Sequence, residues 1–550
     1  MILTNFLNLK LTTTILVVLT LFMLSSCSKT TETETIAHNN IKLNVRVLGI
    51  ADMKINQSVK SKASNSSQGA SQEPELISEK IVSFPSFDTQ LSLRQADTDN
   101  RHSVGGSRMS GRGATEGKRS AAMEGGITYR LWIYDEDDAL VSSTQLTADG
   151  PSEITLPSGE TYSWCAVSYH NSDPIPEVDS NNPVLNVPEN TDLLYASGII
   201  EAPVQTPGEN LSVGIVFAHK YARIALELNT MGMFGNMNNV GLTISGAAGT
   251  KASINLKDGS LSNISSDPAT ISFDDFQDVD PLHADRKIAY VYTAVESSMD
   301  LKVNINALDI QLGNGTNRVF SNLAENPAVF EFSFTPQIGA SYTATMNFIE
   351  SFLLVNSVRF ARTNLYYHGG HNPYRFLPTN EHTDASNTYF AFRGVLPGHY
   401  GNSLTSGDPC GLVYPEGSWK TPGFNDFSMI TPVYPVETYK TENGLGYFEY
   451  EDTQGTGAPY PSDKLRLNFN GYGTAVGDET NGLIVFDLND TYGRSASLWT
   501  TSSGGFNGLG VYYYNGALTS GDNVNRELID YQGTGYVQTT FKNIRCIRTR

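Results

Sequence analysis

The chain has 550 residues, of which 57 are acidic and 37 are Lys or Arg, so its formal net charge at pH 7 is −20. This acidity excludes nucleic acid as a partner, because binding to phosphates requires clustered Lys and Arg side chains. The 49 Gly, the 27 Tyr and the 10% of aromatic residues favour β-structure with many turns. The length allows several domains that each bury a core of their own.

The first 26 residues predict a bacterial lipoprotein signal peptide. Lys10 precedes the apolar run TTTILVVLTLFML, and the following LSSC ends at Cys27. The run is shorter than the roughly 20 residues that a membrane-spanning helix needs. In a lipobox an apolar residue and two small residues precede an acylated cysteine, so we expect a mature chain that begins at lipidated Cys27 and meets the membrane only through this lipid. The alternative is an ordinary signal with a coincidental cysteine.

Residues 41–51, IKLNVRVLGIA, alternate apolar and polar side chains and predict a half-buried strand. The pattern is then lost up to residue 122, apart from the island KIVSFPSFDTQLSL, which is either a strand or a docking segment. A loop of this length inside a compact domain is usually functional or disordered. The alternating pattern resumes with ITYRLWIYDEDDALVSSTQL, which predicts a β-hairpin. TYSWCAVSYH is a further strand, and its Cys165 is expected to be unpaired.

A second β domain is expected after the Pro-containing joint EAPVQTPGENL. It opens with LSVGIVFAHKYARIALELNTM and closes with FEFSFTPQIGASYTATMNFI, which both alternate over long spans. Between them, ISFDDFQDVDPLHAD is acidic but lacks the spacing of a calcium loop, which favours a solvated turn.

From about residue 352 the composition shifts to Tyr, Gly and Asn, which indicates a third domain. Cys410 and Cys546 lie in this region and could pair in the oxidising environment outside the cytoplasm. Such a bridge would add roughly 4 to 5 kcal/mol of stability in the chain-entropy model. The absence of a CxxC pair removes support for a structural zinc site.

The chain resembles the fimbrillin superfamily of Bacteroidota type V pili over residues 40 to 350. The resemblance lies in the lipobox at Cys27, the strand LNVRVLG, the arginine-bearing loop, ITYRLWIYDEDDALV, VFAHKYARIALELNT and TPQIGASYTATMNF. The remainder is similar to C-type-lectin-like domains, in which a cysteine before a tryptophan-containing stretch pairs with a cysteine near the end. Trp419, Lys420, Thr421 and Pro422 fill the first place and Arg545, Cys546, Ile547 and Arg548 the second, so the resemblance implies a Cys410–Cys546 disulfide.

The expected fold class is therefore mainly β, with two tandem fimbrillin-type β-sandwich domains followed by a C-type-lectin-like α+β domain. The expected parts are a signal peptide (1–26), a propeptide with the first strand and a disordered arginine-bearing loop (27–119), an N-terminal fimbrillin-type domain (120–198, completed by strand 41–51 before cleavage), a second fimbrillin-type domain (199–350) and the lectin-like domain (351–550).

The resemblance implies that an arginine-specific protease cuts the loop after the first strand and that a strand from a neighbouring subunit then fills the groove. The candidate cleavage sites are Arg94, Arg101, Arg108, Arg112 and Arg119. The last two are nearest the strand that resumes the fold, whereas Arg46 lies within a strand and is a poorer site. One cut would shed the anchor and vacate the strand. The alternative is a flexible linker whose charges only keep it soluble.

These features predict an accessory subunit at the tip of a fimbria that contributes to adhesion, because the C-terminal end is held in its own domain and can receive a strand but not donate one. Its partners would be stalk and accessory tip subunits and a receptor on host or bacterial surfaces. It would lie in the outer membrane as a lipidated precursor and in the fimbrium when mature. The alternatives are an uncut surface lipoprotein that binds glycan or peptide, a basal anchor of a fimbria, and an enzyme related to formylglycine-generating proteins, which lacks a suitable cysteine pair.

The chain carries no GxSxG, HExxH or P-loop motif, and we expect no enzyme activity, cofactor or metal. His368 and His371 have a spacing that could bind a metal, but their Gly-Gly turn favours ordinary loop histidines. The candidate ligand contacts in the third domain are Trp499, Tyr512, Tyr513, Asn489 and Asp490. The alternatives are core packing for the aromatic residues and a surface turn for the Asn-Asp pair.

Overall fold

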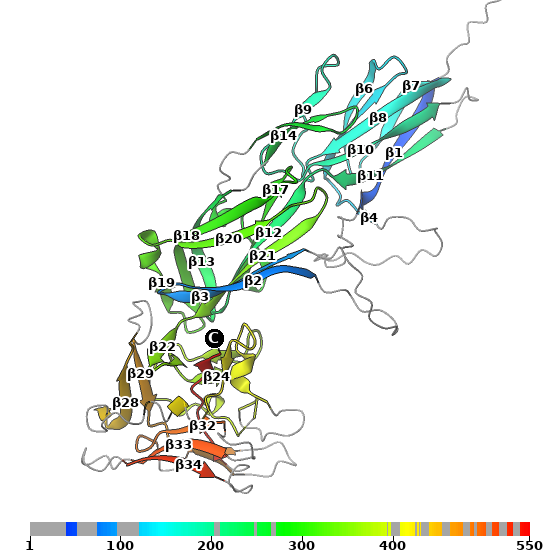
Figure 1. Cartoon of the computed structure of the whole chain (residues 1–550). Helices are drawn as coiled ribbons and strands as arrows, with labels where there is room; N and C mark the ends of the chain where they lie inside the picture. The colour runs from blue at the N-terminus through cyan, green and yellow to red at the C-terminus, as the bar shows by residue number, and fades with distance from the viewer. Residues whose placement is uncertain are drawn as a thin grey trace, which may run out of the picture.

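The computed structural model shows a mainly β protein, as the composition predicts (Figure 1). Among the described residues, no helix has the length and apolar character needed to cross a membrane. The structure describes residues 40–51, 74–95, 120–202, 210–246, 250–265, 271–392, 394–397, 407–423, 426–427, 430, 439–453, 463–476, 485–488, 492–501, 509–515, 525–531 and 540–549.

The first β domain has one core between two groups of strands. One group is antiparallel and contains β5 (Thr128–Tyr134), β6 (Leu140–Thr147), β8 (Glu160–Ser168) and β10 (Leu194–Ala202). The other contains β1 (Asn40–Ala51), β4 (Ser120–Ala121), β7 (Glu153–Pro157) and β11 (Asn210–His219). β10 and β11 join the groups through only two residue pairs, Leu194 with His219 and Tyr195 with Ala218. The predicted hairpin is confirmed as β5 and β6, and the predicted strand TYSWCAVSYH as β8.

The second β domain is a sandwich of two sheets. Its six-stranded sheet has the order β16 (Gln277–Asp280), β17 (His283–Thr293), β12 (Ala222–Gly232), β21 (Ser341–Glu350), β3 (Phe87–Gln95) and β2 (Glu75–Ser83). The other sheet contains β13 (Gly235–Ser245), β18 (Met299–Leu312), β19 (Asn317–Val319) and β20 (Ala328–Phe334). One apolar core contains side chains from both sheets.

The expectation of a disordered stretch is wrong for residues 75–95, because they contain the two strands β2 and β3. The island KIVSFPSFDTQLSL contains the end of β2, the following turn and most of β3, whose Phe87, Leu91 and Leu93 are buried in the core of the second domain. β3 pairs along its whole length with β21, which lies about 250 residues further along the chain. Its other neighbour is β2, so the β2–β3 hairpin completes one side of the six-stranded sheet (Figure 1).

The expected boundary between the two β domains at residues 198 and 199 is also displaced. The long alternating run at LSVGIVFAHKYARIALELNTM is two strands, because the chain turns between His219 and Ala222. β11 belongs to the first domain and β12 to the second. Alternation continues across the turn, so the pattern alone does not mark the boundary.

A small sheet and a second apolar core join the first two domains. The sheet has the order β15 (Leu261–Ser265), β14 (Lys251–Asn255) and β9 (Val184–Asn186). Beside this core, the Asp192 carboxylate contacts the ring Nδ1 atoms of His170 and His219, at 2.8 and 2.7 Å. Burial raises the pKa of Asp192, but its hydrogen bonds with the two imidazoles outweigh burial and hold this pKa well below its usual range.

The described residues of the third domain form small sheets and short 3₁₀ segments. Its C-terminal strand β36 (Ile547–Arg548) lies between β23 (Val358–Ala361) and β26 (Trp419–Lys420), with β22 (Phe352–Val355) beyond β23. The remaining strands are β24 (Leu365–Tyr367), β25 (Tyr374–Phe376), β27 (Tyr439–Glu442), β28 (Leu445–Glu451), β29 (Lys464–Asn468), β30 (Gly473–Val476), β31 (Val485–Leu488), β32 (Ser497–Thr500), β33 (Leu509–Asn515), β34 (Asn525–Tyr531) and β35 (Thr540–Phe541).

The position of β3 in the core generates a stability prediction. Phe87→Ala should lower the free energy of unfolding of the second domain by about 3 to 5 kcal/mol, because it leaves a cavity at a fully buried site. Ile81→Ala on β2 is the control, since that side chain is 49% exposed and its loss should change stability by about 0.5 kcal/mol or less. Urea unfolding, followed by hydrogen exchange in β21, measures both. Equal shifts for the two variants would contradict the assignment of β3 to the core.

Candidate functional site

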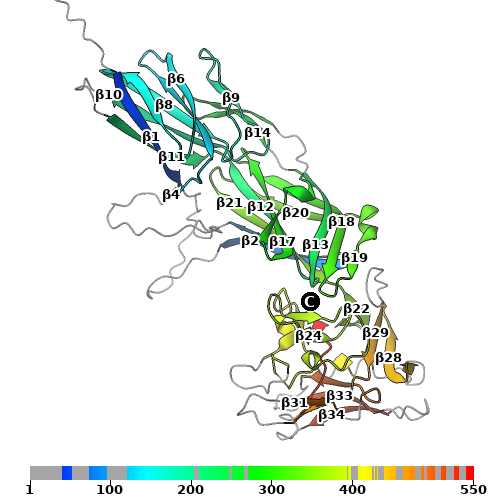
Figure 2. The ribbon, with the colours of Figure 1, turned by 180° about the vertical axis from the view of Figure 1, so that it is seen from behind.

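The candidate site is the groove that holds β1, between β11 and β7 in the first domain. β1 runs parallel to β11, in register from Lys42 with Asn210 to Ile50 with Phe217. On its other side it runs antiparallel to β7 near its start and to β4 at its end. β1 is therefore the strand that connects β11 with β7, and both lose a hydrogen-bonded neighbour if β1 leaves. Figure 2 shows β1 beside β11 from behind.

Four apolar side chains of β1 fill this groove. Ile41, Leu43, Val45 and Ile50 are buried in the core of the first domain, whereas Lys42 and Arg46 are exposed. This pattern confirms the strand predicted from alternation in residues 41–51. Each such side chain contributes about 1.5 to 3 kcal/mol when fully buried. An empty groove would thus expose apolar surface worth on the order of 10 kcal/mol.

A bulge fixes the register of β1 in the groove. The pairing with β11 shifts between Val47 and Gly49, and Gly49 has φ of 148°, a conformation that side chains rarely adopt. Leu48 then lies against Gly214 of β11, where a Cβ atom would be only 2.5 Å from the Leu48 Cδ1 atom. A strand that occupies this groove must therefore match both the spacing of the apolar pockets and the space above Gly214.

Of the candidate cleavage residues, the structure describes Arg94. Arg94 does not lie in mobile surroundings as expected, because it is in β3, opposite Leu76 of β2 and Thr343 of β21. A protease cannot bind this segment in extended form while both ladders are intact, so Arg94 is a poor site. Outside the described residues lie Arg101, Arg108, Arg112, Arg119 and the lipidation candidate Cys27.

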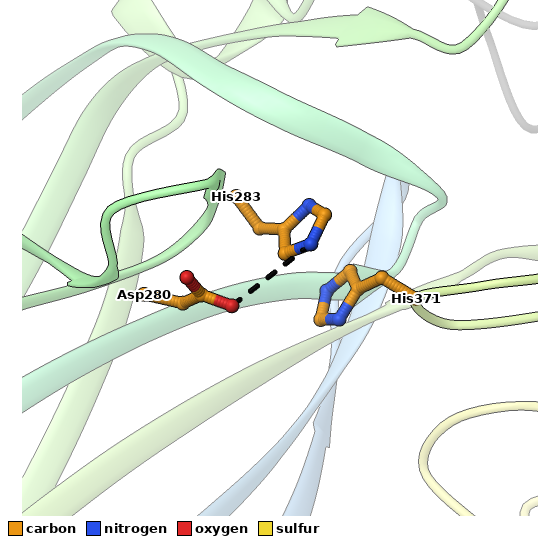
Figure 3. Close-up of side chains that lie close together, drawn as sticks. All are labelled: Asp280, His283 and His371. Atoms are coloured by element: carbon orange, nitrogen blue, oxygen red, sulfur yellow. Dashed lines mark ion pairs between the residues drawn. The ribbon is translucent and has the colours of Figure 1, made fainter.

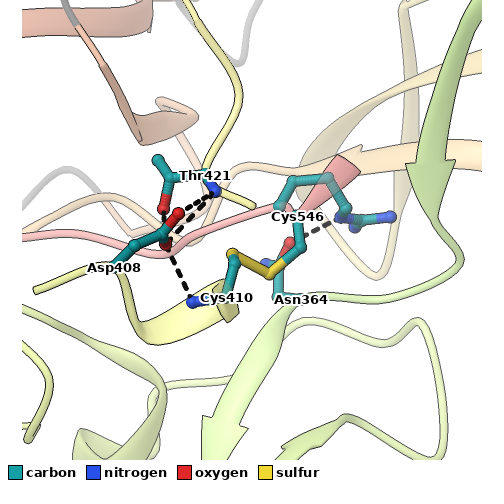
Figure 4. Close-up of a disulfide and its surroundings, with 6 residues drawn as sticks. Asn364, Asp408, Cys410, Thr421 and Cys546 are labelled. Atoms are coloured by element: carbon teal, nitrogen blue, oxygen red, sulfur yellow. Dashed lines mark hydrogen bonds between the residues drawn. A yellow bond between two sulfur atoms is a disulfide. The ribbon is translucent and has the colours of Figure 1, made fainter. Parts of the chain in front are cut away.

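The predicted disulfide between Cys410 and Cys546 is confirmed, with a Cα–Cα distance of 5.7 Å (Figure 4). Beside it, the carboxylate of Asp408 accepts hydrogen bonds from the backbone N–H of Cys410, at 3.0 Å, and from the hydroxyl of Thr421, at 2.7 Å. The disulfide links the segment before β26 to the C-terminal residues, and the Asp408 hydrogen bonds link the same segment to the residue after β26.

Arg545 anchors the same C-terminal segment although sequence reasoning gave it no role of its own. Its guanidinium is fully buried and donates to the side-chain oxygen of Asn364, at 2.8 Å, and to the backbone carbonyl oxygens of Arg362 and Arg466, at 2.9 and 2.7 Å. Burial lowers its pKa to about 9. Neutral acceptors from two separate parts of the domain thus converge on one residue near the C-terminus.

The candidate ligand contacts are placed only in part. Trp499 is 1% exposed and its indole N–H donates to the carbonyl oxygen of Phe390 at 2.6 Å, which favours core packing, the alternative considered for this residue. Trp499 is among the residues that line a cavity of about 320 Å³, together with Asp408 and Thr421. Tyr512 and Tyr513 lie on β33, for which only the backbone is described. Asn489 and Asp490 lie outside the described residues.

Two histidines and an aspartate meet where the second and third domains touch (Figure 3). Ligand atoms of Asp280, His283 and His371 lie within 4.8 Å of one another, and His371 also contacts Asp285 at 2.8 Å. The His283 and His371 rings are stacked, with centroids 3.9 Å apart and planes at 7°. Nitrogen lone pairs lie in the ring planes, so parallel rings do not converge on one cation. We assign this group to the contact between domains.

Cys165 is the free cysteine among the described residues, as predicted, and is buried in β8. Burial raises the pKa of its thiol to about 12. A thiol that stays protonated and covered is chemically inert, which makes a structural role the adequate account of this residue.

The sequence matches no family model and no curated protein. Its fold is similar in part to that of a candidate cell adhesion protein from Bacteroides fragilis, at 11% identity and a TM-score of 0.32, covering 57% of this chain and 97% of that one. A candidate cell adhesion protein from Bacteroides uniformis has 16% identity and a TM-score of 0.27, covering 42% and 91%. The fimbrial anchor protein Mfa2 from Porphyromonas gingivalis has 16% identity and a TM-score of 0.23, covering 35% and 74%. Likenesses at these scores define no function for this chain.

The groove generates a prediction about β1 itself. Leu43→Ala should lower the free energy of unfolding of the first domain by about 2 to 5 kcal/mol, since Leu43 is fully buried between the two groups of strands. Arg46→Ala, on the exposed face of the same strand, should change it by about 0.5 kcal/mol or less. Urea unfolding with hydrogen exchange read in β11 measures the effect. An unchanged β11 in the Leu43 variant would mean that β1 does not support the sheet.

Proposed function

We propose that the chain is an accessory subunit of a fimbria, exported as a lipoprotein, cut after an arginine between residues 101 and 119, and assembled by donor-strand exchange. A strand from a neighbouring subunit enters the groove of β1. The proposal extends the resemblance to fimbrillins, and the groove of β1 is the observation that carries it.

The position of β1 in the chain supports this mechanism. β1 precedes the arginines of residues 101–119, whereas all the strands around its groove follow them. A cut between these two parts removes the covalent link between β1 and its groove. The groove still requires a strand, because its apolar pockets and the ladders of β11 and β7 would otherwise face water. An incoming strand satisfies both, and the irreversible hydrolysis of the peptide bond gives the exchange its direction.

The C-terminal residues support a place at the tip of the filament. β36 is hydrogen-bonded between β23 and β26, and Cys546 is bridged to Cys410. Thr549 also donates its backbone N–H to the carbonyl oxygen of Ser418 at 3.0 Å. Residues 541–549 are thus held inside the third domain and cannot serve as a donor strand. A subunit that receives a strand without donating this segment caps a chain of subunits.

The third domain would then face outward, where its surface meets a receptor on host or bacterial cells and contributes to adhesion. Stalk and accessory tip subunits are the other partners. The proposal involves no catalysis and no cofactor. The lipidated precursor would reside in the outer membrane and the cut form in the fimbrium.

N-terminal sequencing of the protein from isolated fimbriae tests the proposal. The mature chain should begin directly after one of Arg101, Arg108, Arg112 and Arg119, and alanine at all four positions should leave the uncut form on the cell surface. Single alanine variants then identify the arginine that is cut. Arg46→Ala is the control and should be cut as the native chain is, because Arg46 lies in a paired strand. Fimbriae that contain only the uncut chain, which continues from Cys27 through residue 119, or that lack the chain, would contradict the proposal.

A further inference from the structure

The segment that precedes the arginines belongs to two domains. β1 lies in the first domain, and the β2–β3 hairpin lies in the second (Figure 1). Residues 52–73 connect them. A stretch of this length can span up to about 70 Å when extended, so β1 can leave its groove without pulling on the hairpin.

β3 is held in the second domain by a long ladder and by the core. Nine of its residues, Phe87 to Gln95, are in register with Glu350 to Tyr342 of β21. Phe87 contacts the rings of Phe320 and Phe348 edge to face, at centroid distances of 5.7 and 5.3 Å. The hydroxyl of Ser86, in the turn before β3, accepts a hydrogen bond from the Asn322 side chain at 2.5 Å.

A buried ion pair also connects the hairpin with the third domain. Arg548 of β36 donates to the carboxylate of Asp88 at 2.6 Å, and the two side chains are only 3% and 8% exposed. The guanidinium also lies over the ring of Trp419, 4.6 Å from its centroid. Loss of Asp88 would leave a charged guanidinium buried without its counter-ion, which is strongly unfavourable. The hairpin therefore fits a surface formed by β21 and the C-terminal strand together.

We propose that this surface retains the β2–β3 hairpin after the chain is cut between residues 96 and 119, so that the cut allows a donor strand to replace β1 without releasing the lipid anchor. The inference rests on the proposed processing of that stretch. Residues 27–95 then remain attached to the rest of the protein through the hairpin alone once a donor strand has displaced β1. A second break, between residues 52 and 73, is needed for release, and this stretch contains Lys54, Lys60 and Lys62 but no arginine. The expectation that one cut sheds the anchor is thereby revised.

The test uses the chain from residue 27 with Cys27→Ser and an affinity tag in place of the lipid. A recognition sequence for a site-specific protease is inserted after Gly106, and in a second version another is inserted after Ser66. Both versions carry Leu43→Asp, which disables β1, and a parallel sample retains Leu43 and receives an excess of a peptide of residues 40–51. After digestion, the tagged fragment and the body are separated by size exclusion in native buffer and identified by mass spectrometry.

With the single cut, the tagged fragment should elute with the body in equimolar amount and separate only in denaturant. With both cuts, the tagged piece that carries β1 should be lost while the hairpin piece stays with the body. Loss of the tagged fragment after the single cut would overturn the inference, and so would its retention after both cuts. Because the cuts are engineered, these outcomes do not depend on natural cleavage, and a failure here leaves the sequencing result for the fimbrial chain unaffected.

Discussion

The structure depends on the fact that a strand in the interior of a sheet cannot leave without a replacement. β1 is bonded to β11 on one side and to β7 and β4 on the other, and it covers the core of the first domain with four side chains. If β1 leaves, the domain loses the hydrogen bonds of two ladders together with the apolar contacts. The free energy of these interactions is a large fraction of the stability of any domain. The first domain is thus stable either with its own strand or with a substitute, and the empty groove is the less stable state that would drive association.

The β2–β3 hairpin in the second domain is held by different interactions from those that hold β1. β3 is also paired on both sides, but one of its partners, β2, travels with it, so only the ladder to β21 would be broken on departure. The body would still lose Phe87, Leu91 and Leu93 from its core and the counter-ion of Arg548. The register of β1 can be imitated by any strand with matching side chains, whereas the hairpin is tied to a buried charge that only a correctly placed carboxylate satisfies. Exchange therefore suits the first groove and retention suits the second.

Local patterns in the sequence predicted most individual strands, since alternation requires only that one face be buried. Residues 41–51 and the hairpin around Asp135 to Asp138 show this. The pairing of strands could not be predicted in the same way, because nothing in the local sequence around Phe87, Leu91 and Leu93 identifies β21 as the neighbouring strand. The disulfide was predicted through the resemblance to lectin-like domains, whereas the burial of Arg545 was not predicted and that of Trp499 was only one of two alternatives. Both are amphipathic, and whether such a residue lies in the core depends on acceptors such as the Arg466 and Phe390 carbonyl groups, which come from distant segments.

The fold also restricts which arginines a protease can use. Cleavage requires several residues in extended form within the enzyme, so an arginine that is paired in a sheet or buried is protected until its domain opens. Arg318 is held by a bidentate ion pair with Glu350, at 2.6 and 3.1 Å, and Arg548 by Asp88. Arg94 is protected by its place between two strands. Among arginines before β4, this leaves those of residues 101–119, which stand between the part of the chain that fills the grooves and the part that forms them. In the proposed processing, an arginine-specific enzyme would need no recognition of the surrounding sequence, because paired strands protect Arg46 and Arg94.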